Sequence, residues 1–259
     1  MTYETLLVSK NDFVTTVTLN RPDRLNALNM QLVNELHDVL AEEDRNDETR
    51  VIVLTGAGRA FSAGADLRPS DTNSRPPSAN ASTLAEKLFQ ALSDVEKPII
   101  ASINGVAVGG GCTMTLLCDI RIASENARFQ LPFTKLGICA ELGSTYVLPR
   151  LIGLGKASEL VLTSKMIEAE EAGQMGLVNH VVPADKLVEV TLEMANSIAK
   201  LPPMAVRMNK RGLKLGIASD IESQVRYENL TISVLNKTED AKEAVLAFRE
   251  KRDPVFSGR

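Results

Sequence analysis

The first half of this 259-residue chain repeats one arrangement several times: a short apolar run, a small-residue loop, and then a helix-like stretch. The clearest runs are Val51–Leu54 and Pro98–Ile103, and each is followed by a turn that contains glycine. Short apolar runs bounded by glycine turns indicate buried strands, and the helices between them cover the sheet. This rhythm predicts an α/β core whose loops gather at strand ends, where functional groups usually lie.

The same half contains further predicted elements. Tyr3–Lys10 and Val14–Leu19 are β-branched runs with a polar break between them, which indicates a hairpin. Helices are predicted over Met30–Glu43 and Ser82–Val95, because leucine and valine recur there with the spacing of one helix face. The stretch Arg68–Asn80 is polar and rich in proline, so we expect a mobile surface loop there.

Helical patterns dominate the second half of the chain. Leu177–Val182 is the one stretch after residue 146 that is typical of a strand. Prolines 202 and 203 separate a predicted core, residues 1–200, from a helical region, residues 201–259. Oligomerisation would explain so long a helical tail, and packing on the core is the alternative. The predicted helices are Ala157–Leu162, Glu168–Met175, Ala184–Lys200, Met204–Leu215, Ile221–Leu235 and Glu239–Glu250.

Composition argues against several functions. The net charge is −4, from 29 basic and 33 acidic residues, which gives no reason to expect a nucleic-acid or anionic-membrane partner. No apolar run approaches membrane-spanning length. The two histidines and three cysteines lack the spacing of a metal site, and a histidine-dependent triad is not expected. We interpret Cys112, Cys118 and Cys139 as buried, reduced thiols of a cytoplasmic protein.

Two small-residue loops are candidate binding elements. Gly109–Gly111 leads straight into an apolar helix-like stretch, and FSAGADL, residues 61–67, follows a predicted strand. Backbone N–H groups in such loops can donate to a carbonyl oxygen that gains negative charge, and together they would form an oxyanion hole. The alternative is a tight turn that needs only the conformational freedom of glycine. Neither loop has the glycine pattern of a phosphate or dinucleotide site.

Glu141 is the candidate proton carrier. It is the only carboxylate in the apolar stretch ICAELGSTY, residues 138–146. A carboxyl group among apolar neighbours has a perturbed pKa and can act as a general acid or base. The alternative is a solvated loop glutamate, or a charge that stabilises the start of the next helix.

Several motifs, in order along the chain, resemble the crotonase superfamily, that is, the enoyl-CoA hydratase/isomerase family. They are NRPDRLNALN (residues 20–29), FSAGADL, NGVAVGGGC with CDIRIAS (residues 104–124), and GLVNHVVP (residues 176–183). The match is good from residue 19 to about residue 183 and looser in the helical tail. The resemblance implies an α/β spiral of strand–strand–helix turns with a helical C-terminal trimerisation region. It also implies a homotrimer or a dimer of trimers.

The same resemblance implies the ligand. The substrate would be an acyl-CoA thioester, with coenzyme A as part of it and no further cofactor or metal. The N–H groups of Ala65 and Gly110 would stabilise the thioester enolate. The residues implied along the CoA are Arg24, Ala63, Gly64, Asp66 and Leu67.

The chain departs from the hydratases of this family at the two positions where they carry glutamate. The residue directly after GGGC is Thr113, and the position soon after the next strand is Phe133. Threonine is no general base near neutral pH, and phenylalanine has no proton to give. Glu141 instead resembles the single catalytic glutamate of the Δ3,Δ2-enoyl-CoA isomerases, and ring-isomerising relatives place an aspartate there.

We therefore predict an isomerase that shifts the double bond of a 3-enoyl-CoA to give the trans-2-enoyl-CoA, with Glu141 as the proton shuttle. One carboxylate suffices, because the proton leaves C2 and returns at C4. The first alternative is hydration of an enoyl-CoA, or ring isomerisation, on the same scaffold. The second alternative is a CoA-ester-binding protein without chemistry.

Overall fold

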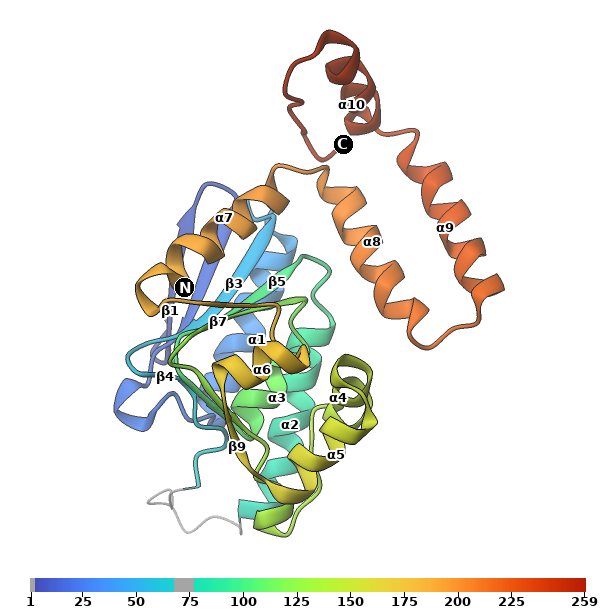
Figure 1. Ribbon diagram of the computed structural model, residues 1–259. Helices are drawn as coiled ribbons and strands as arrows, with labels where there is room; N and C mark the ends of the chain where they lie inside the picture. Colours follow the sequence, from blue (N-terminus) through green and yellow to red (C-terminus); the bar gives the residue numbers. More distant parts are fainter. Residues whose placement is uncertain (1–2, 68–76) are drawn as a thin grey trace.

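The computed structural model describes residues 3–67 and 77–259, and its core is built on two sheets (Figure 1). The larger sheet has six strands in the order β1-β2-β3-β5-β7-β10. β1 and β2 form the predicted antiparallel hairpin, and every later pair is parallel. The strand bounds are β1 (Leu6–Asn11), β2 (Val14–Leu19), β3 (Val51–Gly56), β5 (Ile99–Ile103), β7 (Ile120–Ser124) and β10 (His180–Val182).

The smaller sheet has four short strands in the order β4-β6-β8-β9. The pairs β4–β6 and β6–β8 are parallel, whereas β9 runs antiparallel to β8. Each strand of this sheet comes shortly before or after a strand of the larger sheet, so the chain alternates between the two. The bounds are β4 (Ala60–Ser62), β6 (Val106–Val108), β8 (Arg128–Gln130) and β9 (Met166–Glu168).

Helices enclose the sheets on both sides. α1 (Met30–Arg45), α2 (Pro77–Ser93) and α3 (Gly110–Leu116) contribute to the main hydrophobic core, and α7 (Leu187–Ala199) packs on the opposite face of the larger sheet. The predicted leucine and valine face of α1 is fully buried. Asn29 caps this helix, because its side chain accepts a hydrogen bond of 2.9 Å from the Leu32 N–H.

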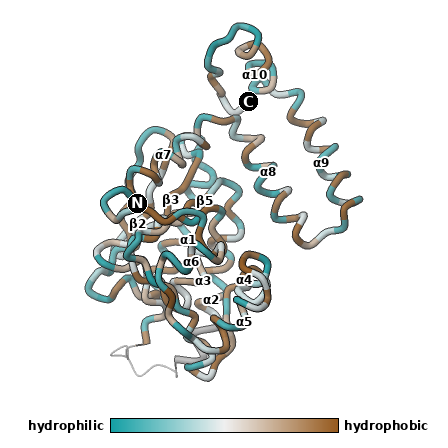
Figure 2. Tube along the Cα trace, viewed as in Figure 1, coloured by the Kyte–Doolittle hydropathy of each residue, from teal (hydrophilic) through white to brown (hydrophobic). Residues whose placement is uncertain are grey.

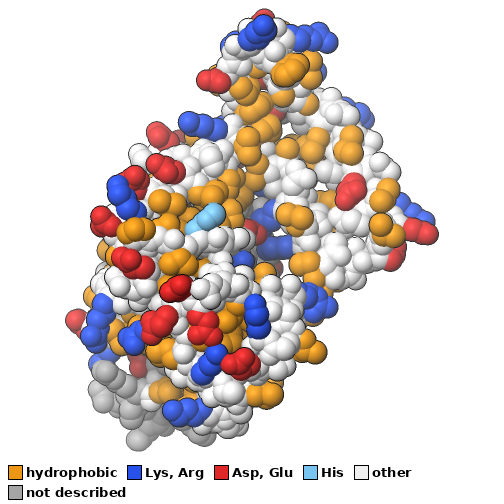
Figure 3. All heavy atoms as spheres, in the orientation of Figure 1, with side chains coloured by type: hydrophobic (Ala, Val, Ile, Leu, Met, Phe, Trp, Pro, Cys, Tyr) orange, Lys and Arg blue, Asp and Glu red, His pale blue; other side chains and the backbone are white. Residues whose placement is uncertain are grey.

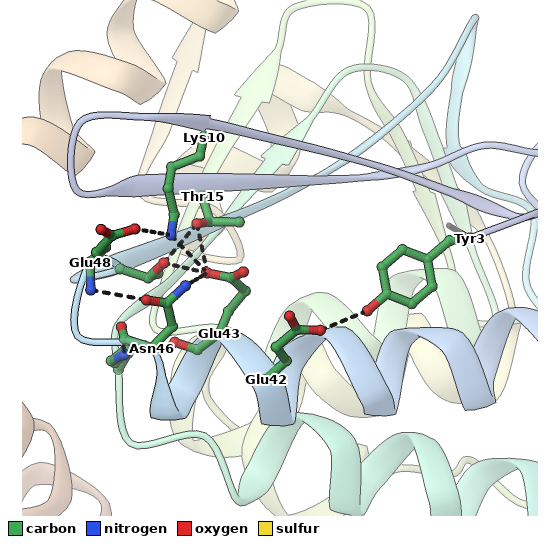
Figure 4. A network of polar contacts seen from close by, with 9 residues as sticks. Tyr3, Lys10, Thr15, Glu42, Glu43, Asn46 and Glu48 are labelled. Carbon is green, nitrogen blue, oxygen red and sulfur yellow. Dashed lines mark hydrogen bonds and ion pairs between the residues drawn. The ribbon is translucent and has the colours of Figure 1, made fainter. Parts of the chain in front are cut away.

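A buried carboxylate fastens the end of α1 to the N-terminal hairpin (Figure 4). Glu43 accepts hydrogen bonds from the hydroxyls of Thr15 and Thr49, and Lys10 Nζ lies 3.7 Å away. Burial alone would raise the pKa of Glu43, but the Thr49 and Thr15 hydroxyls hold it below its usual value. The Lys97 ammonium donates to the Glu43 and Asn46 carbonyl oxygens, both at 2.7 Å, and so satisfies the last turn of α1.

Six shorter elements complete the core. They are the helices α4 (Ser144–Ile152), α5 (Leu154–Thr163) and α6 (Ala169–Met175) and the 3₁₀ turns η1 (Pro22–Arg24), η2 (Thr134–Leu136) and η3 (Ala184–Lys186).

Three helices at the C-terminus stand away from the sheets as an arm: α8 (Pro203–Gly216), α9 (Ile221–Leu235) and α10 (Glu239–Glu250) (Figure 1). Hydrophobic residues recur along α8 and α9 (Figure 2). Hydrophobic side chains of the arm and of the segment after it are uncovered in the single chain: Leu213 in α8, Phe248 in α10 and Val255 after α10 are 76%, 85% and 80% exposed. Among residues 3–67 and 77–259, no helix combines the length and the apolar character needed to cross a bilayer.

Lys210 connects this arm to the core. Its sequence pattern favours a solvated helix face, shared with Arg211 and Lys214, but the Lys210 ammonium is buried. It lies 2.8 Å from Asp119 Oδ2 and donates to the Lys97 carbonyl oxygen at 2.7 Å. Figure 3 shows Lys and Arg side chains in the hollow between the arm and the core. A lysine can be buried here because both a charge and a carbonyl compensate its lost hydration.

Several details of the sequence prediction were wrong. Helix α2 begins at residue 77 and includes the last part of the predicted loop 68–80, whose remaining residues, 68–76, lie outside the described residues. Helix α4 and the strands of the smaller sheet, β4, β6, β8 and β9, were missed. Burial of Leu148 and Ile152 maintains α4 although Pro149 lies within it, and three residues are too few to show strand alternation. Cys139 is exposed, because its loop lies outside the core.

Candidate active site

Three loops meet at one end of the smaller sheet. They follow β4, β6 and β8, which run parallel to one another, and the carboxyl ends of parallel strands lie along one edge. Ala65 comes three residues after β4, Gly110 comes two residues after β6, and Glu141 lies in the longer connection after β8. Two loops that are far apart in the sequence and one distant glutamate are thereby brought together.

The loop that contains Ala65 is paired to the segment before α1. Leu28 N donates to the Gly64 carbonyl oxygen at 2.7 Å, and Asp66 N donates to the Leu28 carbonyl oxygen at 2.9 Å. This is an isolated parallel bridge between Leu28 and Ala65. In such a bridge the N–H of the central residue points away from its partner segment. Ala65 is exposed, and its N–H donates to no acceptor within residues 3–67 and 77–259.

The neighbouring N–H groups of this loop are all occupied. Ala63 N donates to the Leu25 carbonyl oxygen at 2.9 Å, and Gly64 N donates to Ser62 Oγ at 3.2 Å. Ala65 therefore presents the one N–H between residues 63 and 66 that remains for a ligand in the described structure.

The glycine loop lies directly against this segment. Gly109 has φ +53 and donates its N–H to the Gln130 carbonyl oxygen at 2.9 Å, which turns the chain into α3. A methyl group added to Gly64 would lie 2.5 Å from the Val108 carbonyl oxygen and 3.3 Å from Gly110 N. The close approach needs glycine at position 64, and it places the N–H of Gly110 next to the loop of Ala65.

Glu141 lies against the same glycine. Its Oε1 would be 3.1 Å from a methyl group on Gly110, and the Leu28 side chain would be equally near. The carboxyl group has no hydrogen-bond or ion-pair partner within the described residues, and burial raises its pKa above the usual value. The next residues, Leu142 and Gly143, both have positive φ, 56° and 68°. A left-handed leucine is strained, so the turn that presents Glu141 is maintained by its surroundings, in which Leu142 is buried.

The two positions at which the resemblance predicts carboxylates are filled differently. Thr113 is fully buried, and its hydroxyl is directed at the backbone, 3.3 Å from the Gly109 carbonyl oxygen and 3.4 Å from that of Gly110. Phe133 belongs to the main hydrophobic core. Neither side chain can exchange a proton with a ligand.

The remaining predicted contacts lie around these loops. Arg24 is exposed in η1, and Leu67 is exposed two residues after Ala65. Asp66 forms an ion pair of 2.9 Å with Arg21. Within the described parts of the chain, no group of three or more His, Cys, Asp or Glu side chains has the arrangement of a metal site.

The sequence prediction did not include Arg21 and Asn26. Asn26 is buried with φ +54, and its amide donates to the carbonyl oxygens of Ala57 and Ala60 at 2.9 and 2.8 Å. The backbone carbonyl oxygen of Asn26 accepts a hydrogen bond from Ser62 Oγ at 2.8 Å. Asn26 thus joins the loop before α1 to β4. Arg21 and Asp66 each follow a strand, which was the one signal in the sequence. An arginine or an aspartate after a strand is too common to identify a functional residue.

The arrangement has a definite chemical capacity. Two N–H groups on adjacent loops can donate to one carbonyl oxygen and stabilise negative charge on it. A carboxylate with a raised pKa beside them can take a proton from the neighbouring carbon and return it. The site therefore suits proton transfer next to a carbonyl group.

Known proteins resemble this chain in sequence and fold over almost its whole length. The family profile described as enoyl-CoA hydratase/isomerase matches residues 9–259. The short-chain-enoyl-CoA hydratase of Clostridium acetobutylicum is 40% identical over 253 residues, which is 97% of each chain. The 2,3-dehydroadipyl-CoA hydratase of Escherichia coli is 39% identical over 98% of this chain and 99% of its own. The crystal structure of an enoyl-CoA hydratase from Bacillus anthracis superimposes with a TM-score of 0.93 at 37% identity, covering 99% and 100% of the two chains.

The contact between the two loops predicts that Gly64→Ala destabilises the protein. The new methyl group would overlap the Val108 carbonyl oxygen, and φ is +84 there. Left-handed strain alone costs about 1–2 kcal/mol, and the overlap adds to it. Gly155→Ala is the matched control, since a methyl group there meets nothing within 4 Å and α5 gains a better helix former. Urea unfolding at one protein concentration measures both, and parental stability of Gly64→Ala would contradict the described contact.

The raised pKa of Glu141 predicts a pH-dependent stability change in Glu141→Gln. Because the folded protein holds this proton more tightly than the unfolded chain, stability falls as pH rises from the usual glutamate pKa to the raised one. Glutamine removes that loss, so the variant should unfold at a higher urea concentration than the parent at about pH 7. The difference should disappear below the usual glutamate pKa. Glu96→Gln, at an exposed position, should show no such difference. A Glu141→Gln protein less stable than the parent at about pH 7 would disprove the assignment.

Proposed function

The chain belongs to the enoyl-CoA hydratase/isomerase (crotonase) family, and we propose that it isomerises a 3-enoyl-CoA to the trans-2-enoyl-CoA. The observation that carries the proposal is one carboxylate, Glu141, beside Gly110 and the N–H of Ala65, which has no acceptor among the described residues. The fold and the family agree with the resemblance seen in the sequence. The isomerase branch is our finer inference, since the relatives named above are hydratases.

In the proposed reaction the thioester carbonyl oxygen accepts hydrogen bonds from the Ala65 and Gly110 N–H groups. Glu141 removes a proton from C2, and the electron pair of the C–H bond moves to give a dienolate whose negative charge rests on that oxygen. The same proton then returns from Glu141 to C4, which leaves the double bond between C2 and C3. A positioned base contributes about 10²–10⁴-fold to the rate, and an oxyanion donor contributes about 10²–10³-fold.

The surroundings of Glu141 suit this role. A desolvated carboxylate with a raised pKa is a stronger base than a solvated one and still gives its proton up. Leu28 and Gly110 border it, so the acyl chain beside the thioester would meet apolar groups. Thr113 and Phe133 supply no second acid or base, which favours a shuttle by one residue over two-residue chemistry.

Hydration is the second candidate, and the names of the relatives favour it. It requires a water held beside C3 and activated for attack. One carboxylate can do this, but with less assistance than the two that the resemblance leads us to expect in hydratases. Ring isomerisation of a CoA ester would use the same single base. A CoA-ester-binding protein without chemistry remains as a third reading, and the carboxylate beside Gly110 argues against it.

We further propose that Arg24 and the residues 63–67 contact the CoA, which enters as part of the substrate, and that the reaction uses no other cofactor. The exposed positions of Arg24 and Leu67 at the rim of the site are consistent with this. A cytoplasmic location stays a prediction.

We also propose that copies of the chain associate, as a trimer or a dimer of trimers, through the arm α8–α10. The apolar side chains that the arm leaves uncovered support this, since Phe248 and Leu213 are among the most exposed hydrophobic residues described. Sedimentation velocity at about micromolar concentration should show a trimer or larger species. A single monomeric species would contradict the proposal.

Replacement of Glu141 by Gln tests the central claim. The amide cannot accept the C2 proton, so turnover of 3-hexenoyl-CoA should fall by about 10²–10⁴-fold while CoA-ester binding is retained. Deuterium exchange at C2 should fall with it. In the parent enzyme kcat/KM should decrease on the acid side with a midpoint above the usual glutamate pKa.

Parallel assays separate the candidates. The same samples are compared for isomerisation of 3-hexenoyl-CoA and for hydration of trans-2-hexenoyl-CoA, with Glu96→Gln as the control. Faster hydration than isomerisation by the parent would favour the second candidate. Near-parental rates of both reactions in Glu141→Gln would remove Glu141 from the mechanism.

A further inference from the structure

Arg21 lies behind the Ala65 loop and connects its two sides. The guanidinium Nη2 is 2.9 Å from Asp66 Oδ2, and Nη1 donates to the Ala27 carbonyl oxygen. Both charged side chains are only 18% exposed. Ala27 and Asp66 belong to the two segments joined by the Leu28–Ala65 bridge, so one guanidinium bonds to both.

The contacts of Arg21 affect the direction of the Ala65 N–H. The peptide that carries that N–H joins Gly64 to Ala65, and Gly64 and Asp66 are each tied to Leu28. The Arg21–Asp66 ion pair is the next fixed point along the chain, one residue after Ala65. Oxyanion stabilisation needs the donor about 2.7–3.1 Å from the charged oxygen before the reaction begins. Small rotations of the loop would therefore weaken it.

Arg21 also compensates a charge. The carboxylate of Asp66 is one residue from Ala65, and a negative charge there would oppose the negative charge that forms on the thioester oxygen. The partly buried ion pair neutralises it. Arginine suits both tasks, since its planar fork donates in two directions at once, whereas lysine offers a single ammonium centre.

We propose that Arg21 is a positioning residue for the oxyanion hole, acting through Asp66 to fix the direction of the Ala65 N–H and to cancel the Asp66 charge. The inference rests on the proposed role of Ala65, but not on which reaction follows. Variants at Arg21 and at Asp66 remove different parts of this interaction. Loss of Arg21 removes the fixed point and the positive charge that faces Asp66, whereas Asp66→Asn removes the ion pair together with the negative charge.

Isotope-edited infrared spectroscopy tests this on the bound ester itself and does not depend on a rate. The probe is trans-2-hexenoyl-CoA with ¹³C at the thioester carbonyl, bound to each variant. In the parent the two N–H donors should shift the carbonyl band to lower frequency. Arg21→Met should lose most of the shift, while Arg21→Lys and Asp66→Asn should lose part of it. The double variant Arg21→Met/Asp66→Asn should keep more of the shift than Arg21→Met alone, because the negative charge of Asp66 is gone.

Kinetics provide a second measurement on the same proteins. The rate of C2 deuterium exchange should fall about 10–100-fold in Arg21→Met, below the loss expected for a whole oxyanion donor, with a larger effect on kcat than on KM. Arg45→Met is the matched control, because the Arg45 side chain also donates to a backbone carbonyl oxygen, at 2.9 Å, but on the far end of α1. It should leave the band and the exchange rate unchanged.

The outcomes are separable. A full carbonyl shift and an exchange rate within about twofold of the parent in Arg21→Met would overturn the positioning role. If that variant does not fold, an unchanged band in both Arg21→Lys and Asp66→Asn overturns it equally. If the carbonyl band does not shift in the parent, that result would contradict the oxyanion hole and, with it, the inference about Arg21. A parent that shifts the band but does not isomerise 3-hexenoyl-CoA would leave Arg21 in place and contradict only the proposed reaction.

Discussion

The pairing of Leu28 with the segment around Ala65 is the contact on which the site depends. Two backbone hydrogen bonds, at 2.7 and 2.9 Å, pair this loop with the segment before α1. They use the carbonyl oxygen of Gly64 and the N–H of Asp66, on either side of Ala65, and leave the N–H of Ala65 directed outward. The close approach of Gly64 to the Val108 carbonyl oxygen then brings the glycine loop to the same point. A backbone donor fixed in this way needs no reorganisation when charge develops.

The position of Glu141 follows from a different constraint. Its loop crosses the same end of the smaller sheet, and left-handed backbone at Leu142 and Gly143 turns the chain into α4 immediately afterwards. A left-handed leucine costs roughly 1–2 kcal/mol, and a half-buried carboxylate that has no partner among residues 3–67 and 77–259 destabilises the fold further. Strain and an uncompensated acid at one turn are typical of a functional site, since neither contributes to folding.

Sequence patterns predicted the parts of the molecule that depend on local chemistry. The β1–β2 hairpin, the buried face of α1 and the last two helices follow from residue spacing, whereas Ala65 and Gly110 were implied by the resemblance to the family. The rest depends on tertiary contacts. Nothing near Arg21 in the sequence marks Asp66 as its partner, and burial of Lys210 requires Asp119 and the Lys97 carbonyl oxygen from distant elements. Helix α4 exists because the core covers Leu148 and Ile152.

The scaffold and the reaction are determined by different residues. The backbone donors come from loop geometry, which the hydratase of Bacillus anthracis matches closely in overall fold. In the proposed reaction, the proton chemistry depends on three side-chain positions around that geometry. Here two of them, Thr113 and Phe133, are buried and inert, and the third carries a carboxylate that faces Gly110. A thioester bound at these loops would therefore meet enolate stabilisation with one base, which is sufficient to move a proton between C2 and C4 but gives an attacking water little additional help.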